Sequence, residues 1–228
     1  MTLPKALKIV ETDDGSNTIF NPWVDENYHS THGALQESRH VFIDSGLAYL
    51  LGQAPATKSL SIIEVGFGTG LNFLLSADYC SDKVIGLNYT GIEPFPLSEE
   101  MIRQTGYAQY IQPNTWQHFI EKYPDSLNSR ILFSSNCELE IAVCKLQDFH
   151  SERLFDMVYF DAFASVKQPE MWTLEALSHI IKFLKTGGIF VTYAITGNLK
   201  RALKGLNCKI EKVKGAAGKR EMLRAIRL

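Results

Sequence analysis

The sequence predicts an α/β protein built on a doubly wound, mostly parallel sheet that ends in an antiparallel hairpin. Two observations carry this prediction. Short apolar runs rich in β-branched residues alternate with helical patterns, as they do in strand–helix–strand units. Near the C-terminus, two segments of alternating apolar and polar residues, 208–213 and 221–227, are joined by a glycine-rich loop and indicate the hairpin.

The expected elements follow one another with short connections. Ahead of the sheet we expect a hairpin at 8–12 and 18–20, then a helix over 33–49 that Gly46 weakens. The core strands are expected at 60–65, 89–93, 155–161 and 188–193, with a strand pair or hairpin at 131–133 and 138–143 that leads to the third strand. Helices are expected over 71–79, after a cap at Ser98, over 114–122 with an end at 124–126, over 172–184 with a cap at 185–188, and over 198–206.

A glycine-rich turn follows the first core strand directly. Gly66, Gly68 and Gly70 alternate with other residues behind Glu64, in the pattern acid-x-Gly-x-Gly-x-Gly. A dinucleotide fingerprint needs its third glycine where this chain has Leu71, which disfavours a dehydrogenase. A backbone without Cβ atoms lets a cofactor lie against the turn. The pattern resembles the first motif of class I S-adenosylmethionine-dependent methyltransferases, which have a Rossmann-like fold.

Carboxylates stand at the ends of three expected strands: Glu64, Glu93 and Asp161. These ends share the edge of a parallel sheet where ligands bind. We expect Glu93 to accept hydrogen bonds from both ribose hydroxyls of the cofactor. The acid that often contacts adenine on the third strand is not evident, although Lys145 and Gln147 stand near its place and Asp148 slightly later.

Asp161, with Phe163 nearby, would have a clear role in a transferase that methylates an amine. A free amine has a pKa of about 10 and is mostly protonated at neutral pH, so a carboxylate beside the donor methyl would orient it and take its proton. Asp161 would otherwise serve as a positioning group or as a partner for the sulfonium charge. Phe163 would pack on adenine or stack on a flipped base, unless it is a core residue.

Composition and charge limit the class of protein. The chain has 45% hydrophobic residues, no apolar run long enough to span a membrane, no signal-peptide core and no paired cysteine motif among its four cysteines. We therefore expect a cytoplasmic protein with reduced thiols and no metal site. Residues 182–228 carry 12 Lys and Arg against two acids, although the whole chain has a net charge of −2. This asymmetry favours a polyanionic partner or marks a solvated face.

Further motifs resemble one particular family. Several segments resemble, in sequence and in order, those of the MnmC-type tRNA 5-aminomethyl-uridine methyltransferase domain family. They are residues 28–30, 33–38 and 64–73, Asp161-Ala162-Phe163-Ala164 with residues 168–172, and Gly218-Lys219-Arg220-Glu221-Met222. The resemblance runs from about residue 20 to residue 225. It implies a class I methyltransferase that uses S-adenosylmethionine to methylate the aminomethyl nitrogen on the wobble uridine of tRNA, giving 5-methylaminomethyl(-2-thio)uridine.

The resemblance also implies site residues. Asp161 and Phe163 are the expected catalytic residues. The positions expected to bind the cofactor are Tyr28, Glu37, Glu64, Gly66, Gly68, Gly70, Asn72 and Glu93. Those expected to contact tRNA are Lys200, Arg201, Lys219 and Arg220.

Three further expectations concern domain organisation and function. We expect an N-terminal extension over 1–55 that packs at the active-site mouth, and a Rossmann-like methyltransferase domain over 56–228. Bifunctional members of the family carry a flavin-dependent oxidase domain after this one, and the sequence ends at Leu228, so we expect a separate enzyme to supply the aminomethyl group. The alternatives are a methyl- or aminopropyl-transferase acting on a small amine and a non-catalytic nucleotide-binding module.

Overall fold

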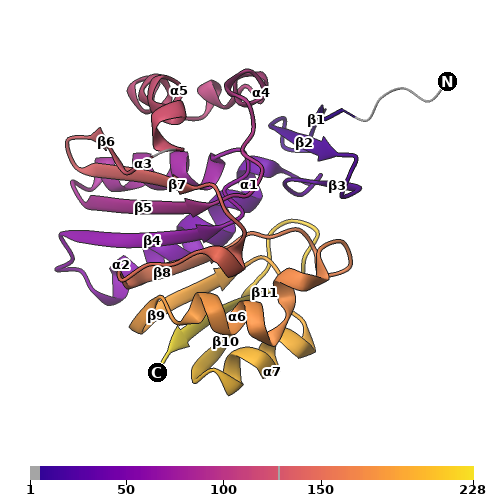
Figure 1. Cartoon of the computed structure of the whole chain (residues 1–228), viewed down its shortest axis with the longest axis vertical. Coiled ribbons are helices and arrows are strands. Elements are labelled where there is room, and N and C mark those ends of the chain that lie inside the picture. The colour runs from indigo at the N-terminus through magenta and orange to yellow at the C-terminus, as the bar shows by residue number, and fades with distance from the viewer. Residues whose placement is uncertain (1–5, 128) are drawn as a thin grey trace.

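The computed structural model describes residues 6–127 and 129–228 and is centred on an eight-stranded mixed sheet (Figure 1). The strands lie in the order β10-β11-β9-β8-β4-β5-β7-β6. The five strands from β9 to β7 are parallel, and β6, β10 and β11 pair antiparallel at the edges. Their bounds are β4 Ser59–Val65, β5 Gly86–Ile92, β6 Ile131–Ser134, β7 Cys137–Ala142, β8 Phe155–Phe160, β9 Leu184–Thr192, β10 Cys208–Lys214 and β11 Glu221–Arg227. The expected fold class, with its C-terminal hairpin, is confirmed.

Two apolar layers form because each central strand is buried on both faces. In β4, Ile62 belongs to one hydrophobic cluster, whereas Ile63 and Val65 belong to the other. The first cluster includes residues of α3 and α5, and the second includes residues of α6 and α7. The helix bounds are α3 Leu71–Asp82, α4 Glu99–Gln104, η2 Tyr107–Gln109, α5 Pro113–Ser126, η3 Leu146–Asp148, η4 Pro169–Trp172, α6 Leu174–Ile181 and α7 Gly197–Gly205.

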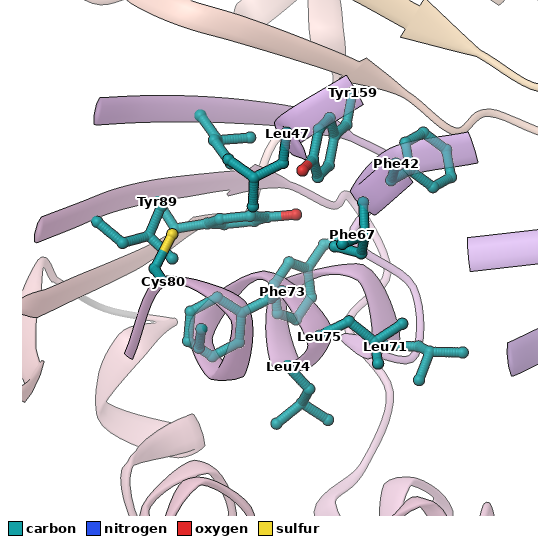
Figure 2. Close-up of a cluster of buried hydrophobic side chains, with 14 of the residues drawn as sticks. Phe42, Leu47, Phe67, Leu71, Phe73, Leu74, Leu75, Cys80, Tyr89 and Tyr159 are labelled. Atoms are coloured by element: carbon teal, nitrogen blue, oxygen red, sulfur yellow. The ribbon is translucent and has the colours of Figure 1, made fainter. Parts of the chain in front are cut away.

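Aromatic rings pack among leucine side chains in the first cluster (Figure 2). The rings of Phe73 and Tyr89 lie 5.1 Å apart between centroids, and those of Phe42 and Tyr159 lie 4.9 Å apart. A buried tyrosine hydroxyl needs a hydrogen-bond partner. Tyr159 lies 3.2 Å from Ser76 Oγ, and Tyr89 donates to Glu64 Oε2 at 2.8 Å. The hydrogen bond from Tyr89 therefore links this core to the acidic end of β4.

The N-terminal part adds a small sheet and a long helical segment. The sheet contains β1 Lys8–Glu11, β2 Asn17–Asn21 and β3 Glu26–Asn27, and the pairing of β1 with β2 confirms the expected hairpin. The helical segment contains α1 Ala34–Ser38, the π-helix η1 Arg39–Ala48 and α2 Tyr49–Gln53. A Cβ atom at Gly46 would lie 3.2 Å from side-chain atoms of Met157 and Val191, so this glycine allows η1 to approach the sheet closely. The division of the chain at residue 55 stays a prediction.

One expected helix end is confirmed and another is wrong. Helix α5 ends at Ser126, within the expected 124–126, and the Ser126 hydroxyl donates to the Tyr123 carbonyl at 2.7 Å in its last turn. The helix expected over 172–184 ends at Ile181, and the cap expected at 185–188 lies inside β9. Phe155 of β8 pairs with Leu184, and this long-range pairing draws the segment into the sheet.

Three further properties concern the described part of the chain. None of its helices combines the length and apolar character that crossing a membrane requires. The four cysteines are free thiols, of which Cys80, Cys137 and Cys208 are buried. Residues 6–127 and 129–228 contain no cluster of three or more side chains suited to hold a metal ion.

Candidate active site

A cavity of about 960 Å³ lies at the carboxyl ends of the central parallel strands. Its wall includes the glycine turn after β4, the ends of β5 and β8, the loop from Lys145 to Asp148 and the segment around Tyr28. The chain reaches β5 on one side of β4 and later returns to β8 on the other side. Ligands of doubly wound sheets bind where the strand order reverses in this way.

The glycine turn can form only without side chains. The φ angles are +84° at Gly66, +52° at Gly68 and +78° at Gly70, in the left-handed region that favours glycine. A Cβ atom at Gly66 would lie 2.5 Å from the carbonyl oxygen of Asp161, and one at Gly68 would lie 3.0 Å from the ring of Tyr28. Gly66 and Gly68 line the cavity, whereas Gly70 is not part of its wall.

Glu93 follows β5 and holds the turn in place. Its Oε2 accepts from the N–H of Gly68 at 3.0 Å, and its Oε1 accepts from the N–H of Phe95 at 2.9 Å. The side chain lines the cavity although the residue is 8% exposed. Burial raises the pKa of Glu93, while these two hydrogen bonds oppose the rise. Each carboxylate oxygen keeps a lone pair for a further donor.

A hydrogen-bonded chain joins Glu64, Asn72 and Asp161. Asn72, in the first turn of α3, donates from Nδ2 to Glu64 Oε1 at 2.7 Å and to Asp161 Oδ2 at 2.8 Å. Glu64 is fully buried and is not part of the cavity wall, whereas Asn72 and Asp161 line it. Burial, followed by the nearby Asp161, raises the pKa of Glu64 well above its usual range. The structure therefore places Glu64 where it supports Asn72.

Asp161 is the carboxylate that faces the cavity directly after β8. Burial and the Glu37 carboxylate raise the pKa of Asp161 to about 7, against the opposing effects of the Asn72 hydrogen bond and the Lys219 charge. Close to neutral pH this group exists in both protonation states, which suits a residue that accepts a proton.

Aromatic rings stand next to Asp161. Tyr28 and Phe163 both line the cavity and meet edge to face with their centroids 5.3 Å apart. The carbonyl of Phe163 accepts from Trp172 Nε1 at 2.8 Å, which fixes the loop after β8. Burial raises the pKa of the Tyr28 hydroxyl to about 12, so it is protonated at neutral pH.

The structure pairs two residues for which the sequence indicated separate roles. Lys219 Nζ lies 2.6 Å from Glu37 Oε1 and 3.9 Å from the centre of the Tyr193 ring. Glu37 also accepts from the N–H of Ser30 at 2.8 Å. Neither Glu37 nor Lys219 is part of the cavity wall, although the charges of both act on Asp161.

The other basic residues expected to contact tRNA lie outside the cavity wall. Lys200 and Arg201 belong to α7, which begins after the carboxyl end of β9, and Arg201 donates to Asn198 Oδ1 at 2.5 Å. Arg220 is exposed next to the start of β11. The structure does not bring these three side chains to the cavity.

Sequence reasoning missed some residues of the site. Tyr89 supports Glu64 from within β5, and only the fold brings the two together. His29 lines the cavity next to Thr18, with 3.3 Å between His29 Nδ1 and Thr18 Oγ1, and burial lowers the pKa of His29 to about 4. The aromatic segment 21–30 was the signal for this wall, and Trp23 also lines the cavity.

Comparisons with known proteins indicate the family of this chain. The family model described as S-adenosyl-L-methionine-dependent methyltransferase matches residues 111–227. Among curated relatives, the tRNA 5-methylaminomethyl-2-thiouridine biosynthesis bifunctional protein MnmC of Idiomarina loihiensis is 32% identical over 87% of this chain and 35% of its own length. The protein of the same name from Actinobacillus pleuropneumoniae is 29% identical over 92% of this chain and 34% of its own length. The chain thus spans about a third of the length of these relatives.

A solved structure supports the fold. The crystal structure of MNMC2 from Aquifex aeolicus matches with a TM-score of 0.77 and 23% identity, over 98% of this chain and 70% of that one. The family model covers more than half of the sequence and ends within β11, so it includes the loop after β8 and the C-terminal hairpin. With its glycine turn and its strand-end carboxylates, the chain belongs to the S-adenosyl-L-methionine-dependent methyltransferase family.

Proposed function

We propose that the protein transfers a methyl group from S-adenosylmethionine to the aminomethyl nitrogen on the wobble uridine of tRNA, giving 5-methylaminomethyl(-2-thio)uridine. The observation that carries the proposal is the position of Asp161, held by Asn72 at the end of β8 beside the glycine turn. The names of the MnmC relatives supply the substrate, since they specify tRNA and a methylaminomethyl product.

The residues of the cavity fit the cofactor. The turn at Gly66 and Gly68 offers a backbone without Cβ atoms, and a side chain there would clash with Asp161 or Tyr28. We propose that Glu93 binds the two ribose hydroxyls with the lone pairs that its contacts with Gly68 and Phe95 leave free. S-adenosylmethionine, when bound, supplies a methyl group whose bond to sulfur breaks with the electron pair on sulfur as the substrate nitrogen bonds to the carbon.

Asp161 would prepare the nitrogen for this reaction. An aminomethyl group must be neutral to offer its lone pair, and a free amine has a pKa of about 10. Ionised Asp161 would accept an N–H of the amine, turn its lone pair toward the methyl group and take the proton that the nitrogen releases. Holding the amine in line with the methyl group can remove roughly 7–11 kcal/mol of the barrier. Phe163 and Tyr28 would contact the uridine base beside the reacting nitrogen.

Basic residues near the same edge of the sheet would contact the tRNA backbone. Arg220 is exposed and Arg201 extends from α7, so both would be available to phosphates, together with Lys200. Lys219 would reach a phosphate only by leaving Glu37. We also propose that a separate enzyme supplies the aminomethyl-uridine, because a methyltransferase consumes this group and does not make it. A tRNA substrate would place the reaction in the cytoplasm.

The test is transfer of labelled methyl from S-adenosylmethionine to bulk tRNA from a strain that lacks this gene, followed by nucleoside analysis. We expect methylaminomethyl-uridine as the product and its loss in Asp161→Ala. Cofactor binding measured by calorimetry should survive in the variant, which separates a lost reaction from a lost fold. Transfer to a small amine with none to tRNA would contradict the proposal. Undiminished transfer in Asp161→Ala would contradict the role of this residue.

A further inference from the structure

The amide oxygen of Asn72 is a buried acceptor without a partner among the described residues. Asn72 is 3% exposed and lines the cavity. A side-chain amide has two N–H donors, and here the nitrogen contacts two carboxylates, those of Glu64 and Asp161. With both carboxyl groups ionised, turning the amide over would bring its oxygen against two acceptors. An unpaired buried acceptor costs free energy, so we expect a bound molecule to donate a hydrogen bond to Oδ1.

The Asp161 carboxylate supplies a second acceptor in the wall of the same cavity. Asn72 donates to Oδ2 of Asp161, and no hydrogen bond from residues 6–127 or 129–228 occupies Oδ1 of that carboxylate. The bond of 2.8 Å between the two side chains fixes them against each other in the wall of one cavity. The site therefore contains two oxygen acceptors on side chains whose relative position is fixed by a hydrogen bond.

The two acceptors, Asn72 Oδ1 and Asp161 Oδ1, match the two N–H donors of a neutral primary amine, which also has one lone pair. We propose that Asn72 Oδ1 and Asp161 Oδ1 each bind one N–H of the substrate amine, and that this pairing makes the protein prefer a primary amine to the secondary amine that its own reaction produces. The proposal rests on the proposed function and identifies Asn72 as a specificity-determining residue of the same site.

Atom and proton balance explains why a second transfer is slower than the first. The nitrogen uses its lone pair to bond the methyl carbon, and Asp161 takes one of its two protons. The product is a secondary amine with one N–H. In a second round Asp161 could bind this N–H, but Asn72 Oδ1 would meet a methyl group and lose its hydrogen bond. A neutral buried hydrogen bond is worth roughly a tenfold factor, so the secondary amine should react more slowly by about that amount.

The experiment compares two tRNA substrates, one with aminomethyl-uridine and one with methylaminomethyl-uridine at the wobble position. We expect wild-type protein to have the higher kcat/KM on the primary amine by about tenfold or more. In Asn72→Ala this preference should fall by about tenfold, because only the primary amine loses an acceptor. Mass spectrometry of nucleosides should then detect dimethylaminomethyl-uridine.

The matched control is Ser76→Ala, one turn later on α3. Ser76 Oγ donates to the backbone oxygen of Asn72 at 2.7 Å, so this variant disturbs the same helix and leaves both proposed acceptors in place. The preference for the primary amine should persist in this control. A change in preference as large as that of Asn72→Ala would overturn the proposal, because helix distortion would then account for both results.

Calorimetry with S-adenosylmethionine distinguishes amine binding by Asn72 from cofactor binding by the same side chain. If Asn72→Ala loses cofactor affinity while the preference stays unchanged, Oδ1 binds the cofactor and the proposal fails. If the rates on both tRNAs fall equally, Asn72 only holds Asp161 and the proposal also fails. A wild-type protein that methylates neither tRNA would overturn the proposed function together with this inference, whereas an active wild type with no preference overturns the inference alone.

Discussion

Replacing Asp161 with asparagine should stabilise the protein in the absence of cofactor, and increasingly so as the pH rises. Burial and Glu37 raise the pKa of Asp161 from 3.8 to about 7 in the folded state. The folded protein then binds this proton more tightly than the unfolded chain does, so stability is lost as pH rises from about 4 to about 7. At about 1.4 kcal/mol per pKa unit, the ionised carboxylate costs about 4 kcal/mol at pH 8. Asparagine avoids this cost and keeps an oxygen that can accept from Asn72.

Urea unfolding at pH 5 and pH 8 tests this expectation. At pH 5 the Asp161 carboxyl is mostly ionised in the unfolded chain but still protonated in the folded protein. The wild-type protein then loses about 2 kcal/mol of its free energy of unfolding. The gain in stability from Asp161→Asn should therefore increase by roughly 2–3 kcal/mol between the two pH values. Asp125→Asn, at an exposed position, is the control for general effects of lost charge. A gain that does not depend on pH, or an asparagine variant less stable than wild type at pH 8, would refute the reasoning.

Three further predictions concern binding and turnover. Gly68→Ala should weaken S-adenosylmethionine binding by tenfold or more in calorimetry, because φ is +52° at this residue and the new Cβ would lie 3.0 Å from the Tyr28 ring. The control is Gly52→Ala, where a Cβ would have no neighbouring atom within 4 Å, and this variant should leave cofactor binding unchanged. The kcat/KM for tRNA should rise with pH through about 7 as Asp161 ionises, and a flat profile would exclude it as the acceptor of the N–H. Arg220→Ala should weaken tRNA binding and reduce the slope of log affinity against log salt by about one, whereas an unchanged slope would remove this residue from the phosphate contacts.

The parts of the site that the sequence predicted are local in the chain. The turn from Gly66 to Gly70 follows its strand immediately, and its glycines predicted a backbone without Cβ atoms, which the structure shows with positive φ angles. Glu93 and Asp161 were found in the same way, because parallel strands bring their carboxyl ends to one edge. The order of strands and helices was therefore enough to predict that Glu93 and Asp161 lie near the glycine turn.

The parts that the sequence did not predict depend on partners far along the chain. Leu184 lies in β9 because it pairs with Phe155, and this pairing overrides a local pattern typical of a helix end. Tyr89 reaches Glu64 only because β5 lies beside β4, and the alternation of side chains on a strand does not say which neighbour a hydroxyl will meet. Side-chain partners across strands follow from the assembled sheet, so sequence reasoning identified the acids and missed what holds them.

The ion pair of Glu37 and Lys219 is another contact between residues far apart in the sequence that sequence reasoning did not predict. The sequence connected Glu37 with the cofactor and Lys219 with tRNA, and in the fold Lys219 Nζ lies 2.6 Å from Glu37 Oε1. The pair connects α1 to the loop of the C-terminal hairpin, and its two charges act on the pKa of Asp161 in opposite directions. Loss of Lys219 alone would leave the Glu37 carboxylate unbalanced, raise the pKa of Asp161 further and lower activity at neutral pH. A loss of activity in a Lys219 variant therefore does not by itself indicate RNA contact, and exposed Arg220 is the cleaner probe of the tRNA surface.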